Sequence, residues 1–314
     1  MGLSRDEAAS YFLSCKLCPR GCGINRFEKR GRCKLGATLK VARAALHYWE
    51  EPCISGKRGS GAVFFSGCSL GCAYCQNASI SDGRAGKEIT PERLTDIFLE
   101  LERQGAHNIN LVTAAHYVPW VVYALEEAKG RGLRVPVVYN SSGYEPAETL
   151  RLLDGLVDIY LPDMKYAESS LAEALSGARD YPEVALSAIE EMLRQCGEPV
   201  IDEEGMLRKG TIIRHLVFPG HTKNSKQVLD GLSARFGTGI CISLMNQYTP
   251  MEGEEGSRLS AVLPSYPELS RKVTEREYDK VLSYALSLGF TQGFFQEGGT
   301  AKESFIPAFD GEGV

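Results

Sequence analysis

The sequence predicts an α/β fold in which short buried strands alternate with amphipathic helices. From residue 61 onward, short and mainly apolar runs recur between longer segments that have helical periodicity. Strands of this composition favour a parallel sheet that is covered on both faces. Repeated β/α units also imply right-handed connections, and they build either a doubly wound sheet or a barrel.

Seven segments have the composition of strands. The first leads directly into a cysteine-rich loop, and the last is the weakest of the set. The segments are 62–66, 108–113, 135–140, 157–161, 211–217, 239–245 and 293–296. Because the chemistry of β/α barrels gathers at the carboxyl ends of the strands, the residues that follow these segments are the candidates for a site.

The helices between the strands begin at clear sequence signals. Thr90 is placed to cap a helix that Pro91 opens, and 274–277 has the pattern of a capping box. Both signals precede apolar residues at helical spacing. Cys196 falls on the apolar face of another helix and Cys241 lies inside an apolar strand, so we interpret both as core residues rather than ligands.

Composition narrows the class of protein. The chain has 314 residues, 24% of them charged, and a net charge of −5 with no long basic run, which argues against binding to nucleic acid. No apolar run approaches the roughly 18 residues of a membrane span. Ten cysteines follow a start that lacks the layout of a signal peptide, so we expect metal or redox chemistry in the cytoplasm.

Three cysteines, Cys68, Cys72 and Cys75, follow the first predicted strand within one loop. Their Cys-x3-Cys-x2-Cys spacing supplies three thiolates, whereas a [4Fe–4S] cluster has four irons that each take an outer ligand. One iron is therefore left open. A structural zinc ion normally takes four protein ligands, so this loop is one ligand short for zinc. Disulfides are not expected in a chain without a secretory leader.

The triad resembles the cluster motif of radical S-adenosylmethionine (SAM) enzymes, and Tyr74 fits the aromatic position before the last cysteine. The resemblance implies that SAM chelates the open iron through its amino and carboxylate groups. An electron from the cluster then cleaves the sulfonium and produces a 5′-deoxyadenosyl radical. The implied fold is the partial (β/α)6 TIM-type barrel of these enzymes, with a small N-terminal cysteine-rich metal knuckle added.

The same resemblance nominates residues that bind SAM. The second predicted strand lacks the Gly-Gly-Glu-like turn of many such enzymes, so Thr113 and His116 are expected to take its part. Asn140 and Ser142 lie in a turn that resembles an Asn-Thr-Asn-Gly turn of activating enzymes, where side chains hydrogen-bond the ribose or carboxylate. The alternatives are that these two residues only form the turn, and that His116 is a structural histidine.

The fourth and fifth predicted strands add three more candidates. Asp163 and Lys165 are similar to an Asp-x-Lys turn, in which the carboxylate accepts from the ammonium or ribose and the lysine donates to a carboxylate. A solvated ion pair is the alternative. His215 lies at the end of the fifth strand, and a structural role is the alternative for it as well.

A second set of cysteines, Cys15, Cys18, Cys22 and Cys33, precedes the predicted barrel. Four thiolates complete a tetrahedral zinc site that helps to fold a short segment. They equally satisfy all four irons of a second [4Fe–4S] cluster, which would relay electrons. Free thiols in an ordinary loop are the third interpretation. We expect two parts in the chain, a cysteine-rich segment 1–60 and a barrel with a C-terminal extension over 61–314.

Longer stretches resemble one branch of the radical SAM enzymes, the pyruvate formate-lyase activating-enzyme-like proteins. They are the N-terminal Cys-x-x-Cys-Pro-Arg element at 15–20, the passage 47–77, and the segments 110–113, 163–165 and 305–311. The resemblance implies an oxidoreductase that abstracts a hydrogen atom, with a glycine of a partner enzyme as the implied hydrogen donor. It also implies flavodoxin or ferredoxin as the one-electron reductant. Glycyl-radical activating enzymes typically have Cys-x-Trp-Cys-His-Asn where this chain has Cys-Ala-Tyr-Cys-Gln-Asn. The alternatives are therefore another peptide, a small metabolite, or an iron–sulfur electron carrier.

Overall fold

A computed structural model of the chain describes residues 2–253, 256–296 and 307–314, and Phe305 and Ile306 of the C-terminal motif lie outside them. Its sheet has the strand order β10-β9-β8-β6-β5-β4-β2-β1-β3, and β7 pairs with β8. The strands are β1 (Leu39–His47), β2 (Ser60–Phe65), β3 (Lys87–Ile89), β4 (Ile109–Val112), β5 (Val137–Ser141), β6 (Ile159–Pro162), β7 (Val200–Ile201), β8 (Leu207–Leu216), β9 (Cys241–Met245) and β10 (Gly293–Phe295).

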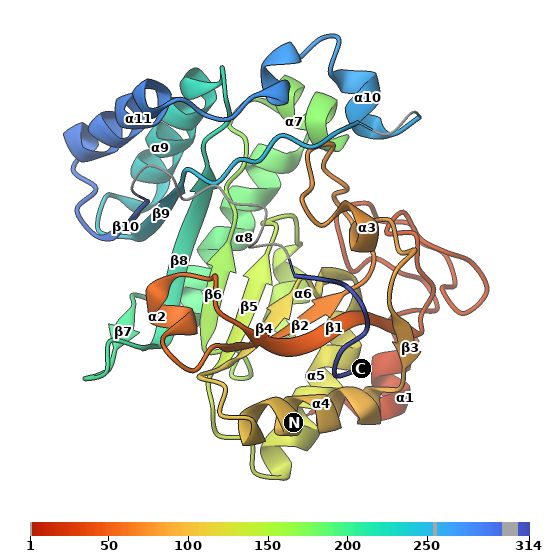
Figure 1. Ribbon diagram of the computed structural model, residues 1–314. Helices are drawn as coiled ribbons and strands as arrows, with labels where there is room; N and C mark the ends of the chain where they lie inside the picture. Colours follow the sequence, from red (N-terminus) through yellow and green to blue (C-terminus); the bar gives the residue numbers. More distant parts are fainter. Residues whose placement is uncertain (1, 254–255, 297–306) are drawn as a thin grey trace.

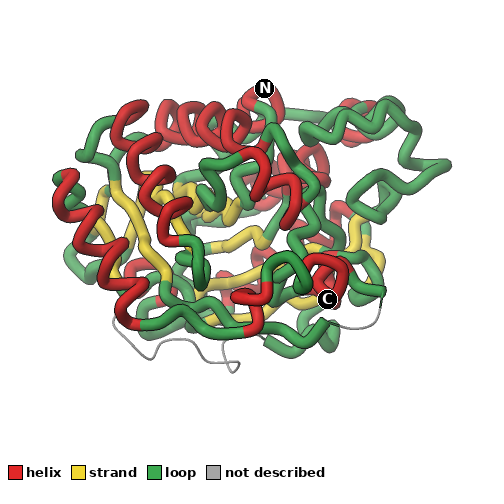
Figure 2. The backbone as a smooth tube through the Cα atoms, turned by 90° about the horizontal axis from the view of Figure 1, so that it is seen from above, coloured by secondary structure: helices red, strands yellow, loops and turns green. Residues whose placement is uncertain are grey.

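The sheet is parallel from β2 to β10, so the predicted α/β class is confirmed. All seven predicted strands are present, with ends that differ by a few residues. Within the described residues the two edges, β3 and β10, are not paired with each other, so the barrel is open. Figure 2 shows the strands as a curved row with helices along the outer side.

The helices cover the outer face of the curved sheet (Figure 1). The longer ones are α4 (Pro91–Arg103), α5 (Val118–Gly130), α7 (Ser169–Ser176), α8 (Tyr181–Cys196), α9 (Thr222–Phe236) and α11 (Glu275–Leu288). The shorter ones are α1 (Arg5–Ser10), α2 (Pro52–Ser55), α3 (Ala78–Ser81), α6 (Ala147–Arg151) and α10 (Arg258–Val262), with 3-10 turns η1 (Ala115–Tyr117) and η2 (Pro267–Ser270). Both predicted caps are observed, at Thr90 and at Thr274. No helix in the described ranges is long and apolar enough to span a bilayer.

Two antiparallel strands extend the sheet on the side of the N-terminus. β1 pairs with β2 and β3 pairs with β1, and neither strand was predicted. In Figure 1, β1 crosses in front of the parallel strands and the C-terminal segment runs beside it. The amide of Gly311 donates to Ala42 O at 3.0 Å, and the amide of Ala44 donates to Glu312 O at 2.9 Å. The division of the chain at residue 60 stays a prediction.

Side chains alternate between the two faces of each parallel strand. One set packs against the helices, while the other points into the curve of the sheet. At the amino-terminal ends of the strands the inner set is apolar and encloses Cys53 and Ile54 of α2. This apolar cluster also contains Val138, Ile159, Leu161, Leu207, Ile212 and Cys241. The short helix α2 therefore plugs the amino-terminal end of the open barrel and leaves the carboxyl-terminal end for a site.

Candidate functional site

A cavity of about 280 Å³ lies at the carboxyl-terminal ends of the strands, beside the three-cysteine loop. Cys68, Cys72 and Cys75 line it together with polar residues from the ends of β4, β5, β6 and β8. Those polar residues are Thr113, Asn140, Ser142, Asp163, Lys165 and Arg214. Most of the residues that the sequence nominated therefore line one cavity.

The three-cysteine loop is held on both sides by backbone hydrogen bonds. The amide of Gly67 donates to Ile80 O at 2.7 Å, and the amide of Ala73 donates to Leu175 O of α7 at 2.8 Å. Burial raises the pKa of Cys75 to about 12, and the thiols of Cys72 and Cys68 add to the effect. The three thiols are half-buried, and each additional thiolate in the loop makes the next harder to form unless positive charge compensates it. They fit a metal group better than a set of free thiols.

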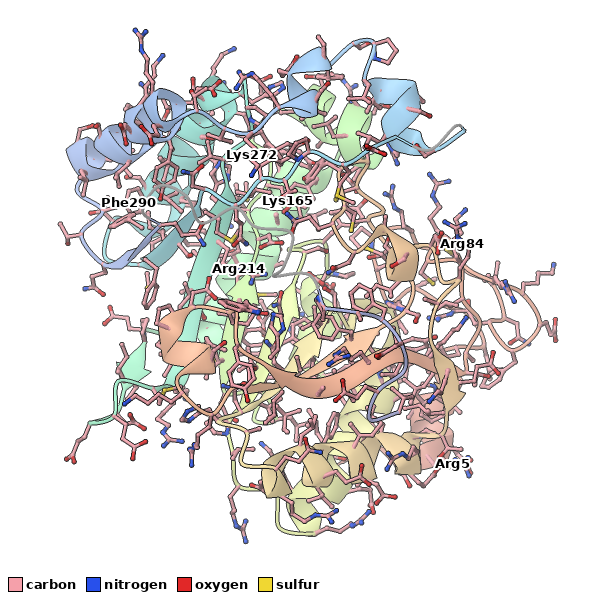
Figure 3. All side chains as sticks on the ribbon, viewed as in Figure 1. Arg5, Arg84, Lys165, Arg214, Lys272 and Phe290 are labelled. Atoms are coloured by element: carbon pink, nitrogen blue, oxygen red, sulfur yellow. The ribbon has the colours of Figure 1, made fainter. Side chains whose placement is uncertain are left out.

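An ion-pair network crosses the cavity floor. Lys165 Nζ lies 2.5 Å from Asp163 Oδ2, and Arg214 Nε donates to Asp163 Oδ1 at 3.1 Å. Burial alone would raise the pKa of Asp163, but Lys165 and Arg214 outweigh it and hold that pKa below its usual value. Figure 3 shows Lys165 and Arg214 in the middle of the molecule. Asp163 is therefore a half-buried carboxylate paired with two cations.

Glu50 is a member of this network that the sequence analysis did not single out. Its Oε1 accepts from Asn110 Nδ2 at 3.3 Å and from Asn140 Nδ2 at 3.1 Å, and its Oε2 lies 3.2 Å from Arg214 Nη1. Glu50 precedes the first barrel strand, so the rule that sites follow strands does not find it. The inward register of Asn110 and Arg214 is the only signal for a polar partner there.

One buried polar atom at the cavity lacks a partner. Ser142 is 8% exposed, and its Oγ accepts or donates no hydrogen bond within the described residues. Buried hydroxyls are nearly always hydrogen-bonded, so the hydroxyl of Ser142 is available to a ligand or a water molecule in the cavity. The cavity wall thus combines three thiols, which suit a cluster, with the hydroxyl of Ser142 and the ammonium of Lys165, which suit an amino-acid-like ligand of that cluster.

The two predicted histidines lie outside the cavity wall. His116 is buried behind the three-cysteine loop, with Nε2 2.7 Å from Ser66 O, and burial lowers its pKa to about 3. His215 contacts Met164 O and Ser225 Oγ through its two ring nitrogens, and burial lowers its pKa to about 4. Alternation along β8 turns Arg214 inward and His215 outward, toward the helices.

Tyr74 has a mixed position. Its ring is part of the cavity wall, next to Phe218 at 4.7 Å between ring centroids. Its hydroxyl is already used, because it lies 2.6 Å from the hydroxyl of Tyr166. Contact with a ligand is therefore left to the face of the ring.

The four N-terminal cysteines come together in space. Burial raises the pKa of Cys18 to about 12, with further effects of the same sign from Cys33, Cys15 and Cys22. The sulfurs of Cys22 and Cys33 both lie within 4 Å of the position that a side chain on Gly31 would occupy. Within the described residues, neither this set nor the three-cysteine loop has three Cys, His, Asp or Glu side chains arranged around a single metal ion. The zinc interpretation gains no support.

This N-terminal segment packs directly on the three-cysteine loop. Arg20 Nε donates to Ser69 O at 2.9 Å, and its Nη2 donates to Ser176 O at 3.0 Å. Leu35 and the carbonyl of Cys33 lie so close to Gly67 that a side chain there would overlap them. The two cysteine sets are thus neighbours, although the sequence alone separates them by more than 30 residues.

Comparison with known proteins identifies the family and its relatives. The profile of the Radical SAM superfamily matches residues 62–230. An uncharacterized protein of Methanocaldococcus jannaschii is 28% identical over 293 residues, which cover 91% of this chain and 78% of the relative. A 7-carboxy-7-deazaguanine synthase of Methanothermobacter thermautotrophicus is 29% identical over 120 residues, covering 38% of this chain and 46% of that enzyme.

The solved structures that match this chain have little sequence in common with it. HydG, a maturase of the [FeFe]-hydrogenase, has a TM-score of 0.49 and 13% identity over 78% of this chain and 53% of its own. SuiB of Streptococcus suis bound to S-adenosylmethionine has a TM-score of 0.47 and 12% identity over 74% of this chain and 49% of its own. The chain spans about half the length of these two structures.

Proposed function

The chain belongs to the radical SAM superfamily, and from that premise we propose that Cys68, Cys72 and Cys75 hold its [4Fe–4S] cluster and that the adjoining cavity binds SAM. The observation that carries the proposal is that the three thiols and the Lys165–Asp163–Arg214 network line one cavity. When bound, the cluster supplies the electron that cleaves SAM to a 5′-deoxyadenosyl radical, which abstracts hydrogen.

The residues of the chain position SAM and keep water away from it. Lys165 offers an ammonium that donates to a carboxylate, and Asp163 holds that ammonium in place. Ser142 supplies a hydroxyl without another partner, and Asn140 is fixed by Glu50 and Arg214. Thr113 completes the wall on the side of β4. His116 and His215 are not part of this proposal, because both are buried away from the cavity.

The cluster assignment is tested by Cys72→Ala, with Cys196→Ala as the matched control. Cys196 is also a buried thiol, but it lies in the core and contacts Val157 O. After anaerobic reconstitution and reduction, we expect wild type and Cys196→Ala to form 5′-deoxyadenosine and Cys72→Ala to form none. Retained SAM cleavage in Cys72→Ala would contradict the assignment.

For the hydrogen donor we propose a glycine of a partner enzyme, on the strength of the resemblance over 47–56 and 163–165. Trp49 is 56% exposed and also lines the cavity, so the cavity reaches the surface, as a macromolecular donor requires. Deuterium placed in candidate glycines should appear in 5′-deoxyadenosine. Transfer from another peptide residue or from a small metabolite instead would identify one of the alternative donors.

For Cys15, Cys18, Cys22 and Cys33 we propose a second iron–sulfur cluster. Four thiolates around one zinc ion stand at about 2.3 Å from it and nearly touch one another, whereas cluster ligands bind separate irons and stand farther apart. The proposal rests on the four thiols being neighbours, because Cys33, Cys15 and Cys22 each act on the pKa of Cys18.

Metal analysis of Cys18→Ala tests this second site. Loss of about four irons per chain, with the cluster at Cys68 intact, is the expected result. Unchanged iron together with lost zinc would support the structural zinc site instead. Unchanged metal content and melting temperature would show that the four thiols bind no metal.

For the electron donor we propose an acidic protein of the flavodoxin or ferredoxin class. Four exposed cations, Lys29, Arg30, Arg32 and Lys34, surround the N-terminal cysteines and form no ion pair with any described residue. We call these four residues the basic loop. A groove of about 850 Å³ lies along it and continues to Arg84, which pairs with Asp82 and which Figure 3 shows on the outside of the molecule. Glu28 and Glu88 also line this groove, so the positive charge that attracts an acidic partner is that of the basic loop itself.

Charge reversal in the basic loop tests this partner. Arg30→Glu and Lys34→Glu should slow reduction by reduced flavodoxin and leave reduction by dithionite unchanged, because dithionite needs no docking surface. Lys280→Glu on α11 is the control for a single charge reversal elsewhere. Equal rates with flavodoxin for all three variants and wild type would contradict the proposal.

A further inference from the structure

A chain of three buried hydroxyls ends on the sulfur of Cys72. Ser176 Oγ lies 3.1 Å from Cys72 Sγ and 2.7 Å from the hydroxyl of Tyr166, which in turn lies 2.6 Å from the hydroxyl of Tyr74. Ser176 and Tyr166 are fully buried, and Tyr74 is 6% exposed. This row of hydroxyls begins at Tyr74 in the three-cysteine loop and returns to the loop through Tyr166, between β6 and α7, and Ser176 at the end of α7.

The backbone around Ser176 is fixed from two directions. Arg20 donates to the carbonyls of Ser176 and Gly177, and the amide of Ala73 in the three-cysteine loop donates to Leu175 O. Ser176 is the last residue of α7, and Gly177 follows in the left-handed conformation with φ of 58°. The hydroxyl of Ser176 is thus aimed at the loop by the end of a helix rather than by a free turn.

The direction of the hydrogen bonds follows from counting hydrogens. An iron-bound thiolate has no hydrogen and only accepts, so Ser176 must donate its single hydrogen to Cys72. Ser176 then accepts from Tyr166, and Tyr166, having used its own hydrogen, accepts from Tyr74. Tyrosine hydroxyls have an ordinary pKa near 10 and keep their hydrogens at neutral pH. Consecutive hydrogen bonds that point the same way strengthen each other in a dry environment.

We propose that Ser176 is a positioning residue that raises the reduction potential of the cluster through Cys72, with Tyr166 and Tyr74 reinforcing its hydrogen bond. Reduction adds one electron, part of whose charge resides on the cysteine sulfurs, so a donor to a sulfur stabilises the reduced form more than the oxidised form. This inference rests on the proposed function, because it requires the cluster at Cys68, Cys72 and Cys75.

The geometry supports an effect on this one thiolate. Cys72 is the only triad sulfur for which a side-chain hydroxyl donor is observed among the described residues, whereas Cys68 accepts from the amide of Gly71 at 3.5 Å. Hydrogen bonds to sulfurs are among the main ways by which proteins set cluster potentials. Loss of this donor should change the reduction equilibrium by up to about tenfold, which is about 59 mV for one electron.

The test is a reductive titration of the reconstituted cluster, followed by its EPR signal. Ser176→Ala should move the midpoint potential to a more negative value, and Tyr166→Phe should move it by a smaller amount in the same direction. Ser170→Ala, at the exposed opposite end of α7, is the control and should leave the potential unchanged. In wild type, the signal of the Ser176 proton coupled to the cluster should disappear when water is replaced by deuterium oxide. In Ser176→Ala this exchangeable signal should already be absent in water.

The outcomes separate this inference from the proposed function. An intact cluster with the wild-type potential in Ser176→Ala overturns the inference, while the proposed function stands. A wild-type protein that binds no cluster at the three cysteines overturns the proposed function itself. If Ser176→Ala loses iron, Tyr166→Phe decides, because it keeps Ser176 and its bond to Cys72. A negative shift there supports the inference, and the wild-type potential overturns it.

Discussion

Arg214 joins three parts of the chain that are far apart in the sequence. Its guanidinium contacts Glu50 from the N-terminal part, Asn140 at the end of β5 and Asp163 at the end of β6. Five donors in a rigid plane suit this task, which lysine could not perform. The residue is buried, so each contact also compensates the cost of desolvating its charge.

Lys165 is the member of the network that can be removed most cleanly. In Lys165→Ala, Asp163 keeps its pair with Arg214, so the fold and the iron content should be unchanged. The affinity for SAM should fall by roughly ten- to a hundredfold, the value of one charge-assisted hydrogen bond of about 1.5–3 kcal/mol. Calorimetry on reconstituted protein measures this, with the exposed Lys223→Ala on α9 as the control. Unchanged affinity would assign Lys165 to a structural ion pair.

Stability should depend on pH through His215. Its pKa is about 4 in the folded chain and about 6.5 in the unfolded chain, so below pH 6.5 the unfolded state binds the extra proton. The free energy of unfolding therefore falls as the pH drops from about 6.5 to about 4, by about 1.4 kcal/mol per pH unit for this group. His215→Asn keeps a donor for Met164 O but does not titrate. Its urea-unfolding energy should depend less steeply on pH, and an equal slope would contradict the assignment.

For single residues, the sequence predicts which side chains are candidates for the site better than it predicts which face of a strand they lie on. Cys68, Cys72 and Cys75 are nominated by their spacing, and Asp163 and Lys165 by their place after a strand and by the resemblance; the structure brings all five to one cavity, and their roles stay predictions. His215 and Arg214 are adjacent, and a shift of one residue in register exchanges the inner and outer faces of a strand. The sequence does not fix that register. Glu50 could not be found, since its contacts join segments that are 60 to 164 residues apart.

Among the elements, the three-cysteine loop depends on two glycines with different surroundings. Gly67 and Gly71 both have positive φ, 81° and 63°. A side chain on Gly67 would meet Leu35 at 2.6 Å and Cys33 O at 2.7 Å, whereas one on Gly71 would meet nothing within 4 Å. Glycine is therefore required at position 67 by both the backbone conformation and the close packing, and at position 71 by the backbone conformation alone.

The pair Gly67→Ala and Gly71→Ala separates these two requirements. Both variants carry the left-handed strain of about 1–2 kcal/mol, and only Gly67→Ala must also displace the N-terminal segment. We expect Gly71→Ala to retain its iron with a modestly lower melting temperature. Gly67→Ala should melt much lower and lose iron from both cysteine sets. Similar melting and iron content in the two variants would contradict the close packing.

The antiparallel strand β1 escaped prediction for a physical reason. Its burial does not alternate along the strand, because β1 is covered on one side by α4 and on the other by the C-terminal segment. A register shift between Val41 and Arg43 further disturbs the period of two. The parallel strands were predictable because both their faces are buried, which leaves continuous apolar runs in the sequence.

Across the whole molecule, Arg20 connects the N-terminal segment to the site. Its guanidinium donates to carbonyls of Ser69 and Leu70 in the three-cysteine loop and of Ser176 and Gly177 at the end of α7. It also lies over the ring of Tyr144, 5.1 Å from the centroid. The two parts of the chain that the sequence suggests as separate are therefore joined where the cluster would sit.

Arg20→Ala should loosen the loop without removing any cysteine. Four carbonyls lose their donor, so we expect lower retention of iron at the three-cysteine site during gel filtration and faster bleaching in air. Arg30→Ala, in the same segment but exposed and outside these contacts, should behave as wild type. Equal iron retention in both variants would mean that the loop is held by its own backbone bonds.

The plug formed by α2 has a kinetic consequence. Among the described residues, Cys53 and Ile54 fill the amino-terminal end of the barrel, so SAM and the macromolecular donor proposed above would both enter beside Trp49. The smaller molecule has to arrive first, since a docked macromolecule would obstruct its path to the cysteines. The products of SAM cleavage can be released only after the donor has dissociated. Turnover is then a compulsory sequence of arrivals and departures, and excess donor should inhibit competitively with respect to SAM.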